Sequence, residues 1–237
     1  MICTPPRCIL TGASSGIGLA LARLLLDEGW TVIGVDRQPV PVDLGPAYTH
    51  HLCDLSDPNA VRRLALSLDG GPITGFVHAA GVMRTGGIID TRDQDAALMW
   101  QLHVGAPMAL LRAIVPSLLE RRARIVLVSS RAVLGRAHRA AYASSKAAQI
   151  GLARSLAAEL IGRGITVNVV APGAVDTPML SDPSRGAPAQ ISLPIGRLIQ
   201  PDEVAGAVAY FLSVSAGAVT GQTLYVCGGA SLGSGPL

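Results

Sequence analysis

The sequence predicts an α/β fold, in which a single domain contains a doubly wound, seven-stranded, mostly parallel sheet with helices on both faces. Short apolar runs rich in β-branched residues alternate with longer segments of helical periodicity along the chain. The runs are apolar almost throughout, which is typical of parallel strands covered by helices on both faces. The 237 residues show no internal repeat and no linker, so residues 1–237 are predicted to form one domain.

Seven runs are predicted to be strands because they are short, apolar and bounded by turn residues. In chain order they are residues 7–11, 31–35, 48–52, 74–78, 124–129, 165–170 and 222–226. The segments predicted to be helices are 16–29, 58–69, about 92–119, about 140–162 and 201–213. Right-handed crossovers between these strands give the doubly wound arrangement.

One segment has no clear period. Residues 178–200, "PMLSDPSRGAPAQISLPIGRLIQ", are rich in Pro, Gly and Ser. A loop of this length inside a compact domain is functional or mobile. We expect it to form a lid over a ligand.

Composition excludes several classes of function. The net charge is +3, and the longest basic cluster is "ERRAR" at 120–124, so no nucleic-acid-binding face is expected. No segment reaches the ~18 uninterrupted apolar residues of a membrane span. The four cysteines form no CxxC pair, which argues against a metal site or a disulfide framework and favours reduced thiols in a cytoplasmic protein.

The segment "CILTGASSGIGLALARLLLDEG" has the order strand, glycine-rich turn, amphipathic helix. Gly12, Gly16 and Gly18 allow a tight turn, a close approach of backbone to a pyrophosphate, and close packing of helix on strand. The free N–H groups at the start of the helix favour the negative charge of a phosphate. The sequence therefore predicts a dinucleotide site.

The end of the second strand indicates which dinucleotide binds. Asp36 can accept hydrogen bonds from both ribose hydroxyls of an adenosine and would repel a 2′-phosphate. Arg37 could instead receive that phosphate, but no Arg or Lys lies within the glycine turn to help it. NAD is favoured over NADP. Asp54 could bond the adenine amino group, or form a turn or cap a helix.

Acid–base chemistry is predicted at "YASSK". Tyr142 and Lys146 are four residues apart and so lie on one face of a helix. A phenol is a poor base near neutral pH, but a neighbouring ammonium lowers its pKa. Ser130 follows the fifth strand, where it would orient a substrate oxygen, and Ser129 is the alternative.

At this point the sequence resembles the short-chain dehydrogenases/reductases. The motifs "TGASSGIG" (11–18), "HAAG" (78–81), "SS" (129–130), "YASSK" (142–146) and "APGAVDTPM" (171–179) follow that family's order. The resemblance covers nearly the whole chain. It implies a Rossmann-type fold, a nicotinamide cofactor, hydride transfer at a carbinol or carbonyl, and often a homotetramer.

The resemblance also implies roles for individual residues. Tyr142 is the acid/base, Ser130 holds the substrate oxygen, and Lys146 lowers the pKa of Tyr142 and bonds the nicotinamide ribose. Thr177 reaches the carboxamide or phosphate, with a local turn as its alternative role. The expected cofactor-binding residues are Gly12, Ser14, Ser15, Gly16, Ile17, Gly18, Asp36, Arg37, Asp54, Leu55, Ala79, Ala80, Gly81, Tyr142, Lys146, Pro172, Gly173, Val175 and Thr177.

Two departures from the family pattern place histidines where the family has asparagines. "HAAG" places His78 and Ala79 where the family has asparagines, which is read as a structural adjustment. His103 stands where the family usually has an asparagine whose carbonyl holds a water beside the lysine. Three interpretations are open for it: a structural replacement, an altered proton relay, or a substrate contact. The relay interpretation predicts a shifted pH–rate profile in His103→Asn, because imidazole titrates near neutrality.

The substrate is less defined. Met179, Leu180, Ile191 and Leu193, together with Val133, Leu134 and Ala137, suggest a fairly apolar pocket for a secondary alcohol or ketone, whereas Arg136, His138 and Arg139 could attract an anionic group. An NADPH-dependent 3-oxoacyl-thioester reductase is the second hypothesis. A cofactor-binding regulatory protein without turnover is the third.

Overall fold

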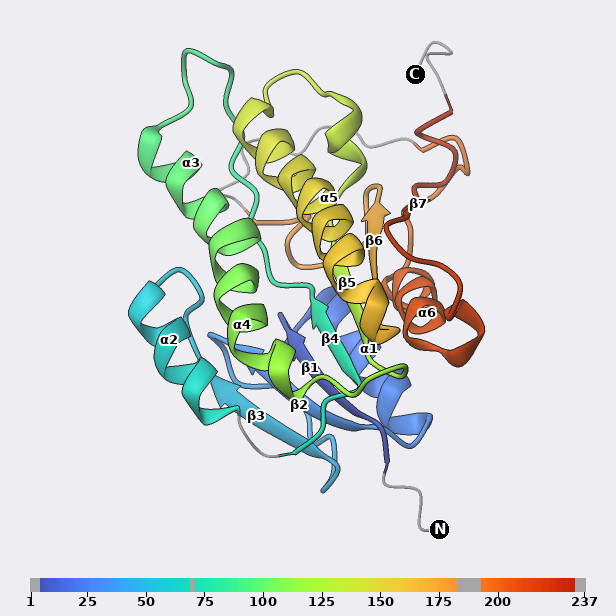
Figure 1. Cartoon of the computed structure of the whole chain (residues 1–237). Helices are drawn as coiled ribbons and strands as arrows, with labels where there is room; N and C mark the ends of the chain where they lie inside the picture. The colour runs from blue at the N-terminus through green and yellow to red at the C-terminus, as the bar shows by residue number, and fades with distance from the viewer. Residues whose placement is uncertain (1–4, 69–70, 183–192, 233–237) are drawn as a thin grey trace.

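The computed structural model describes residues 5–68, 71–182 and 193–232. Its seven strands are β1 (Arg7–Thr11), β2 (Thr31–Asp36), β3 (Tyr48–Leu52), β4 (Gly75–His78), β5 (Arg124–Val128), β6 (Thr166–Pro172) and β7 (Thr223–Val226). They form one sheet in the order β3-β2-β1-β4-β5-β6-β7 (Figure 1). Every neighbouring pair is parallel. The predicted α/β class and the seven-stranded sheet are confirmed.

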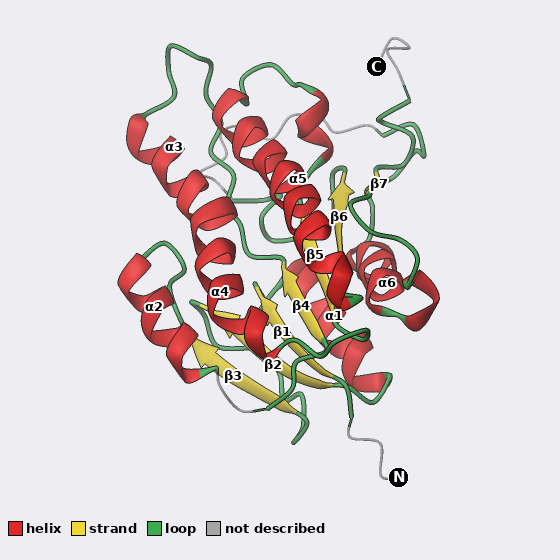
Figure 2. Ribbon diagram, in the orientation of Figure 1, coloured by secondary structure: helices red, strands yellow, loops and turns green. Residues whose placement is uncertain are grey.

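Helices cover both faces of the sheet. They are α1 (Gly16–Asp27), α2 (Pro58–Ser67), α3 (Asp93–Trp100), α4 (Ala106–Ile114), α5 (Ala140–Leu160) and α6 (Pro201–Leu212). Figure 2 shows α2, α4 and α5 in front of the sheet and α1 and α6 behind it. Each strand serves both layers, because alternate side chains point to opposite faces: Ile9 packs in the front core, and Leu10 packs in the back core.

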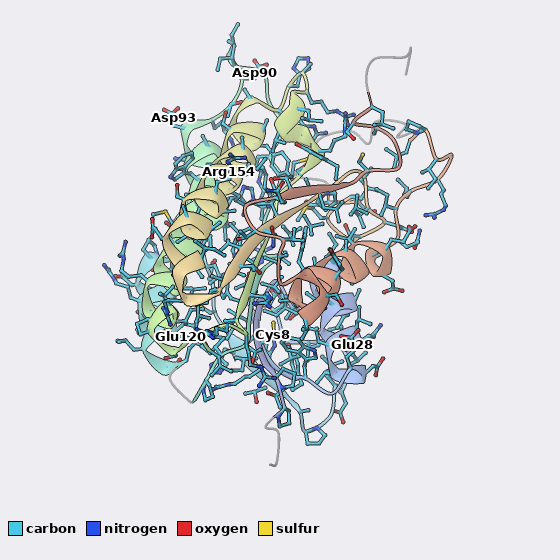
Figure 3. The ribbon with its side chains drawn as sticks, turned by 45° about the vertical axis from the view of Figure 1, so that its right-hand side comes forward. Cys8, Glu28, Asp90, Asp93, Glu120 and Arg154 are labelled. Atoms are coloured by element: carbon cyan, nitrogen blue, oxygen red, sulfur yellow. The ribbon has the colours of Figure 1, made fainter. Side chains whose placement is uncertain are left out.

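The strand order reverses between β1 and β4, where the chain crosses from one half of the sheet to the other. A crevice forms at such a switch point, beyond the carboxyl ends of the strands. Figure 3 shows Asp90 and Asp93, which follow β4, at this end of the molecule, and Glu28 and Glu120 toward the opposite end. Many of the functional residues predicted from the sequence lie near the carboxyl ends of strands or near the starts of helices at this edge, whereas His103 lies within a longer helical run.

The segment 92–119 differs from the prediction of one continuous helix. A π-helical turn, Gln101–Gly105, separates α3 from α4. Pro107 has no N–H to donate to the carbonyl of His103, as an α-helix would require. Side chains supply donors instead: Gln149 Nε2 lies 3.0 Å from the His103 carbonyl, and His78 Nε2 lies 2.9 Å from the Leu102 carbonyl.

The helical run Asp93–Ser117 is long and apolar enough, by length and composition alone, to cross a membrane. Half of its most apolar window is buried inside the structure. The core helix of a soluble α/β domain meets the same criteria, so this run is weak evidence for a membrane span.

Candidate active site

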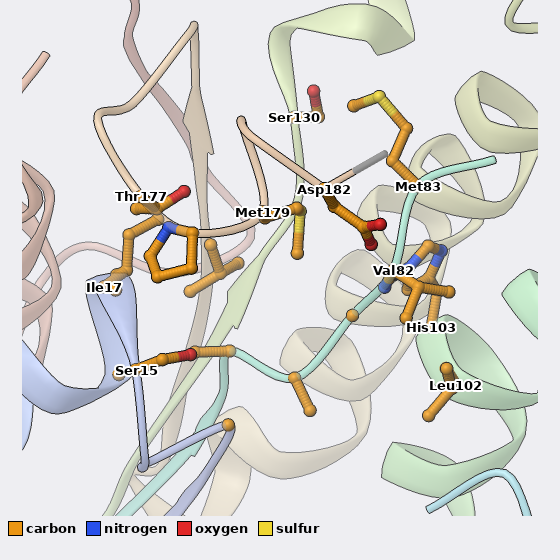
Figure 4. Close-up of a pocket in the computed structure, with 18 of the residues that line it drawn as sticks. Ser15, Ile17, Val82, Met83, Leu102, His103, Ser130, Thr177, Met179 and Asp182 are labelled. Atoms are coloured by element: carbon orange, nitrogen blue, oxygen red, sulfur yellow. Dashed lines mark hydrogen bonds between the residues drawn. The ribbon is translucent and has the colours of Figure 1, made fainter. Parts of the chain in front are cut away.

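A cavity of about 470 Å³ lies at the carboxyl edge of the sheet (Figure 4). Every catalytic and cofactor-binding residue predicted from the sequence lines it. Figure 4 shows Ser15, Ile17 and Thr177 on one side of this space and Val82, Leu102 and His103 on the other. The fold therefore brings the glycine turn, the end of β2 and the Tyr–Lys pair to one place.

The glycine turn has the geometry of a phosphate cradle. Gly12 has a φ of +74°, which favours glycine. A Cβ on Gly18 would lie 1.9 Å from the Gly12 carbonyl oxygen, so α1 approaches β1 at a distance only glycine permits. Within the part of the chain that the structure describes, the N-cap residue Ser15 makes no side-chain capping bond, and the first turn of α1 holds no acidic residue. Its N–H groups suit a pyrophosphate.

The ribose end of the cavity contains Asp36. One carboxylate oxygen accepts the backbone N–H of Ser14 and the other accepts that of Gln38, each at 3.1 Å. Each carboxylate oxygen has more than one lone pair, so both can still accept ribose hydroxyls. Arg37 is exposed at the rim. These residues, with the glycine turn, fit a dinucleotide cofactor.

Asp54 forms a turn, one of the three roles that the sequence leaves open for it. Its Oδ1 accepts the backbone N–H and the hydroxyl of Ser56, at 2.8 and 2.7 Å. The cap of α2 is Asp57, which accepts the N–H of Asn59 at 2.8 Å. Asp54 still lines the cavity, so the adenine contact stays a prediction.

The two serines after β5 differ in their hydrogen bonds. The buried Ser129 hydroxyl donates to the Lys146 carbonyl at 2.8 Å. Ser130 is half-buried, and its oxygen accepts the N–H of Ala132 at 3.1 Å. Because the amide is the donor in that bond, the Ser130 hydroxyl keeps its proton for another acceptor. This difference favours Ser130 over Ser129 as the substrate-binding hydroxyl.

Tyr142 and Lys146 lie one turn apart on α5, both buried and both lining the cavity. Lys146 Nζ donates to the Val128 carbonyl at 2.8 Å. Burial lowers the pKa of Lys146 to about 7. A buried ammonium is therefore poorly solvated, and a nearby anion such as a phenolate would stabilise it.

Lys146 is also the only lysine in the chain, since every other member of the 19 Lys and Arg residues is arginine. Lysine and arginine are not equivalent here: lysine can lose its proton when buried, whereas arginine stays charged. The single lysine among 19 basic residues is therefore a feature of the sequence that indicates a position where the amine must be able to lose its proton.

His103 lies completely buried beside this pair. Its Nδ1 is 2.9 Å from Ser145 Oγ, which itself donates to the Tyr142 carbonyl, so Nδ1 carries the proton. Its Nε2 accepts the N–H of Val82 at 3.3 Å. The ring meets Tyr142 edge-on, with centroids 5.7 Å apart.

Two observations bear on the three interpretations of His103. Burial, and then the charge of Lys146, hold the pKa of His103 well below its usual range, so the imidazole does not titrate near neutrality. Its carbonyl accepts a hydrogen bond from Gln149, a residue that the sequence analysis missed, and keeps a second lone pair for another donor. A relay that depends on a charge change at this imidazole is therefore disfavoured, and a structural role fits its contacts.

His78 is equally buried and is expected to control acid stability. Its Nδ1 accepts the Thr11 hydroxyl at 2.8 Å while Nε2 donates to Leu102. Burial, and then Lys146, lower the pKa of His78 to about 3 from the ordinary histidine value of 6.5. The unfolded chain thus binds a proton that the folded chain lacks between these values, and stability present above pH 6.5 is lost as pH falls toward 3.

His78→Asn should reduce the acid sensitivity of folding. Each such proton changes the free energy of unfolding by up to about 1.4 kcal/mol per pH unit. Urea unfolding between about pH 6 and pH 4 should therefore show a slope smaller by up to this amount. His138→Asn is the control substitution, because His138 is exposed and asparagine tolerates its φ of 57°. Equal slopes in wild type and His78→Asn would contradict the assignment.

The substrate side of the cavity was only partly predicted. Met179 and Leu180 line it, but Val82, Met83 and Arg84, which follow the "HAAG" run, were missed. Leu193 packs in the back core instead, and Leu134 is exposed. Neither these two nor Val133, Ala137, Arg136, His138 and Arg139 line the cavity.

The proposed lid is described only in part. Pro178, Met179, Leu180 and Asp182 border the cavity. Residues 183–192, including Ile191, lie outside the described residues. Asp182 and Asp95 lie 3.9 and 3.8 Å from the Arg84 guanidinium, which links the first part of this segment to the loop after β4.

No group of three or more metal-ligating side chains occurs among residues 5–68, 71–182 and 193–232.

Comparisons with known proteins agree on one family. Residues 12–231 match the family model described as enoyl-(acyl carrier protein) reductase. The 3-oxoacyl-acyl-carrier-protein reductase FabG of Escherichia coli (strain K12) is 35% identical over 234 residues, which cover 93% of this chain and 95% of that protein. BbsD of Thauera aromatica, a subunit of a hydroxy(phenyl)methyl-succinyl-CoA dehydrogenase, is 34% identical over 96% of this chain and 97% of its own length.

Solved structures give the same result. A short chain dehydrogenase family protein from Francisella tularensis superposes with a TM-score of 0.89 at 25% identity, covering 97% of this chain and 100% of its own. The aldohexose dehydrogenase of Thermoplasma acidophilum superposes with a TM-score of 0.88 at 29% identity, covering 98% of this chain and 96% of its own.

Proposed function

Because the chain belongs to the short-chain dehydrogenase/reductase family of nicotinamide-dependent oxidoreductases, we propose that it transfers a hydride between NAD(H) and a secondary alcohol or ketone. The observation that supports this most is the cavity, which gathers Ser130, Tyr142 and Lys146 beside the glycine turn and Asp36. Acid–base groups and a cofactor cradle in one space are what this chemistry requires.

The proposed mechanism assigns a separate task to each side chain. A bound nicotinamide supplies or accepts the hydride. Ser130 donates its free hydroxyl proton to the substrate oxygen and fixes its position. Tyr142 gives its phenolic proton to that oxygen during reduction and takes it back during oxidation. Lys146 stabilises the phenolate, because its buried ammonium has a lowered pKa and needs a neighbouring anion.

The cofactor is proposed to be held by three parts of the cavity. The turn with Gly12, Gly16 and Gly18 would hold the pyrophosphate, and Thr177 packs within van der Waals reach of that turn, since a Cβ on Gly16 would meet its methyl group at 2.9 Å. Asp36 would accept the ribose hydroxyls. Its negative charge disfavours a 2′-phosphate, so NAD is preferred over NADP in this proposal.

Reduction of a 3-oxoacyl thioester with NADPH is the second candidate. The relatives named 3-oxoacyl-acyl-carrier-protein reductase, at 35% identity and with coverage of 95% of their length, favour it. The apolar side chains of Val82, Met83 and Met179 in the cavity are compatible with an acyl chain. The negative charge of Asp36 disfavours NADPH, the cofactor of this second candidate.

A substrate panel with both cofactors separates these functions. Purified protein is assayed by nicotinamide absorbance with linear and cyclic secondary ketones, the matching alcohols and acetoacetyl-CoA, each with NADH and with NADPH. The main proposal expects turnover of simple ketones at a higher kcat/KM with NADH. Turnover confined to the thioester with NADPH would establish the second candidate, and NAD binding without any turnover would indicate a non-catalytic protein.

We also propose a homotetramer or homodimer in the cytoplasm. Trp100 and Met108 are half-exposed on α3 and α4, and the neighbouring α5 exposes the small residues Ala147 and Gly151. Such surfaces suit helix packing between subunits. Cys8, Cys53 and Cys227 are free and buried, as expected in a reducing compartment. Sedimentation as a monomer would contradict the assembly.

A further inference from the structure

His50 on β3 lies beside the turn that follows β2. The parallel register pairs it with Gly34 of β2. His50 Nε2 is 3.0 Å from the Gln38 carbonyl, which can only accept, so Nε2 carries the proton. The other ring nitrogen, Nδ1, lies 2.8 Å from the Tyr48 hydroxyl and accepts from it in the neutral imidazole.

Tyr48 fixes the orientation of this imidazole. The two rings stack with centroids 5.9 Å apart and planes 27° apart. Tyr48 occupies the space above Gly34, where a Cβ would lie 1.9 Å from its hydroxyl oxygen. Burial, and then Asp36, raise the pKa of Tyr48 to about 12, so its hydroxyl stays a donor.

The Gln38 carbonyl connects this pair to the cofactor site. It accepts a second hydrogen bond from Ser14 Oγ of the glycine turn, at 2.7 Å. The N–H of the same residue donates to one oxygen of Asp36, and the N–H of Ser14 donates to the other. The turn from Asp36 to Gln38 is thus held from the glycine turn on one side and from β3 on the other.

We propose that His50 is a positioning residue for cofactor selection: by holding the Gln38 carbonyl, it keeps the Asp36 carboxylate directed at the ribose end of the cavity. Arg37 lies between these two residues, so the same turn also fixes the backbone from which the guanidinium extends. Loss of the His50 bond frees one of the two anchors of this turn. Asp36 is then less well placed for an unphosphorylated ribose, and Arg37 is freer to approach a 2′-phosphate. This inference rests on the proposed preference for NAD.

The test compares the dissociation constants of NADH and NADPH, measured by the nicotinamide fluorescence of the full chain. In His50→Phe, which keeps a ring but has no N–H donor, we expect NADH to bind about three- to tenfold more weakly, the loss of one hydrogen bond. NADPH should bind equally well or more tightly, so the NADH/NADPH preference falls. Tyr48→Phe should lower the NADH/NADPH preference by a smaller factor. His50→Gln, which can still donate to the Gln38 carbonyl, should keep part of the preference that His50→Phe loses.

His51→Phe is the matched control, because the next residue of β3 faces the opposite side of the sheet. It should leave the preference unchanged. A preference equal to wild type in both His50→Phe and Tyr48→Phe would overturn the proposal, as would an equal loss of affinity for both cofactors. If wild type itself prefers NADPH, the proposed cofactor choice fails, and the role of His50 is still decided by whether the ratio shifts in the variants.

Discussion

Tyr142→Phe is expected to lower kcat by about 10²- to 10⁴-fold, the usual contribution of a positioned general acid or base. The substitution removes one hydroxyl and keeps the ring that packs edge-on against His103. The fold and the affinity for NADH should therefore change little. Turnover of the best ketone in the panel, together with an NADH fluorescence titration, measures both quantities.

Tyr210→Phe is the matched control for this loss. Tyr210 is a half-exposed residue of α6 outside the cavity, so removal of its hydroxyl should leave kcat near the wild-type value. Full turnover in Tyr142→Phe would contradict the mechanism. Loss of NADH binding in parallel with turnover would show that the tyrosine holds the cofactor rather than the proton.

Lys146→Met is expected to change activity and stability in opposite directions. Turnover should fall by about 10²-fold or more, because the phenolate of Tyr142 loses its cation. The unfolded amine has a pKa of 10.5 and the folded one about 7, so the folded state lacks a proton that the unfolded state holds between these values. The resulting stability cost is complete below pH 7 and disappears as pH rises to 10.5.

Methionine removes this cost and retains an apolar side chain of similar length. We expect a gain in the free energy of unfolding of about 2 to 3 kcal/mol near pH 6.5 and little gain near pH 10. This gain in the free energy of unfolding is smaller than the full pKa shift of Lys146 implies, because the Val128 carbonyl loses its donor. Urea unfolding at the two pH values measures it, and a destabilised variant at both would contradict the assignment.

The amine can also be observed directly. Since Lys146 is the only lysine, protein labelled with ¹³C at the lysine ε-carbon should give one lysine resonance. In the folded protein without cofactor, its shift should titrate near pH 7, in agreement with the lowered pKa of Lys146. Titration near pH 10.5, the ordinary value for a lysine, would show that the amine is solvated.

Most of the fold was predictable because the local signals agree with the tertiary structure. Most strands are apolar almost throughout, and the limits of all seven fall within about two residues of those predicted from the pattern. The break at Gln101–Gly105 was not predictable. It depends on donors from His78 and Gln149, which reach carbonyls of this turn from distant parts of the chain.

The candidate site likewise contains residues that the sequence predicts and residues that it does not. The glycine turn, Asp36 and the Tyr–Lys pair each carry a short-range pattern, and all of them line the cavity. Gln149 and His50 belong to no such short-range pattern, because their hydrogen-bond partners are backbone carbonyls of other elements. The relay interpretation of His103 is disfavoured for a related reason: the pKa of this imidazole depends on burial, which the sequence does not state.

Deuterium transfer tests the central claim most directly. The protein is incubated with NADH deuterated at the reactive nicotinamide carbon and with the best ketone of the panel, and the alcohol is analysed by mass spectrometry. We predict one deuterium on the carbinol carbon with wild type and almost none with Tyr142→Phe over the same time. NADH binding by wild type without deuterium in any product of the panel would contradict the proposed hydride transfer.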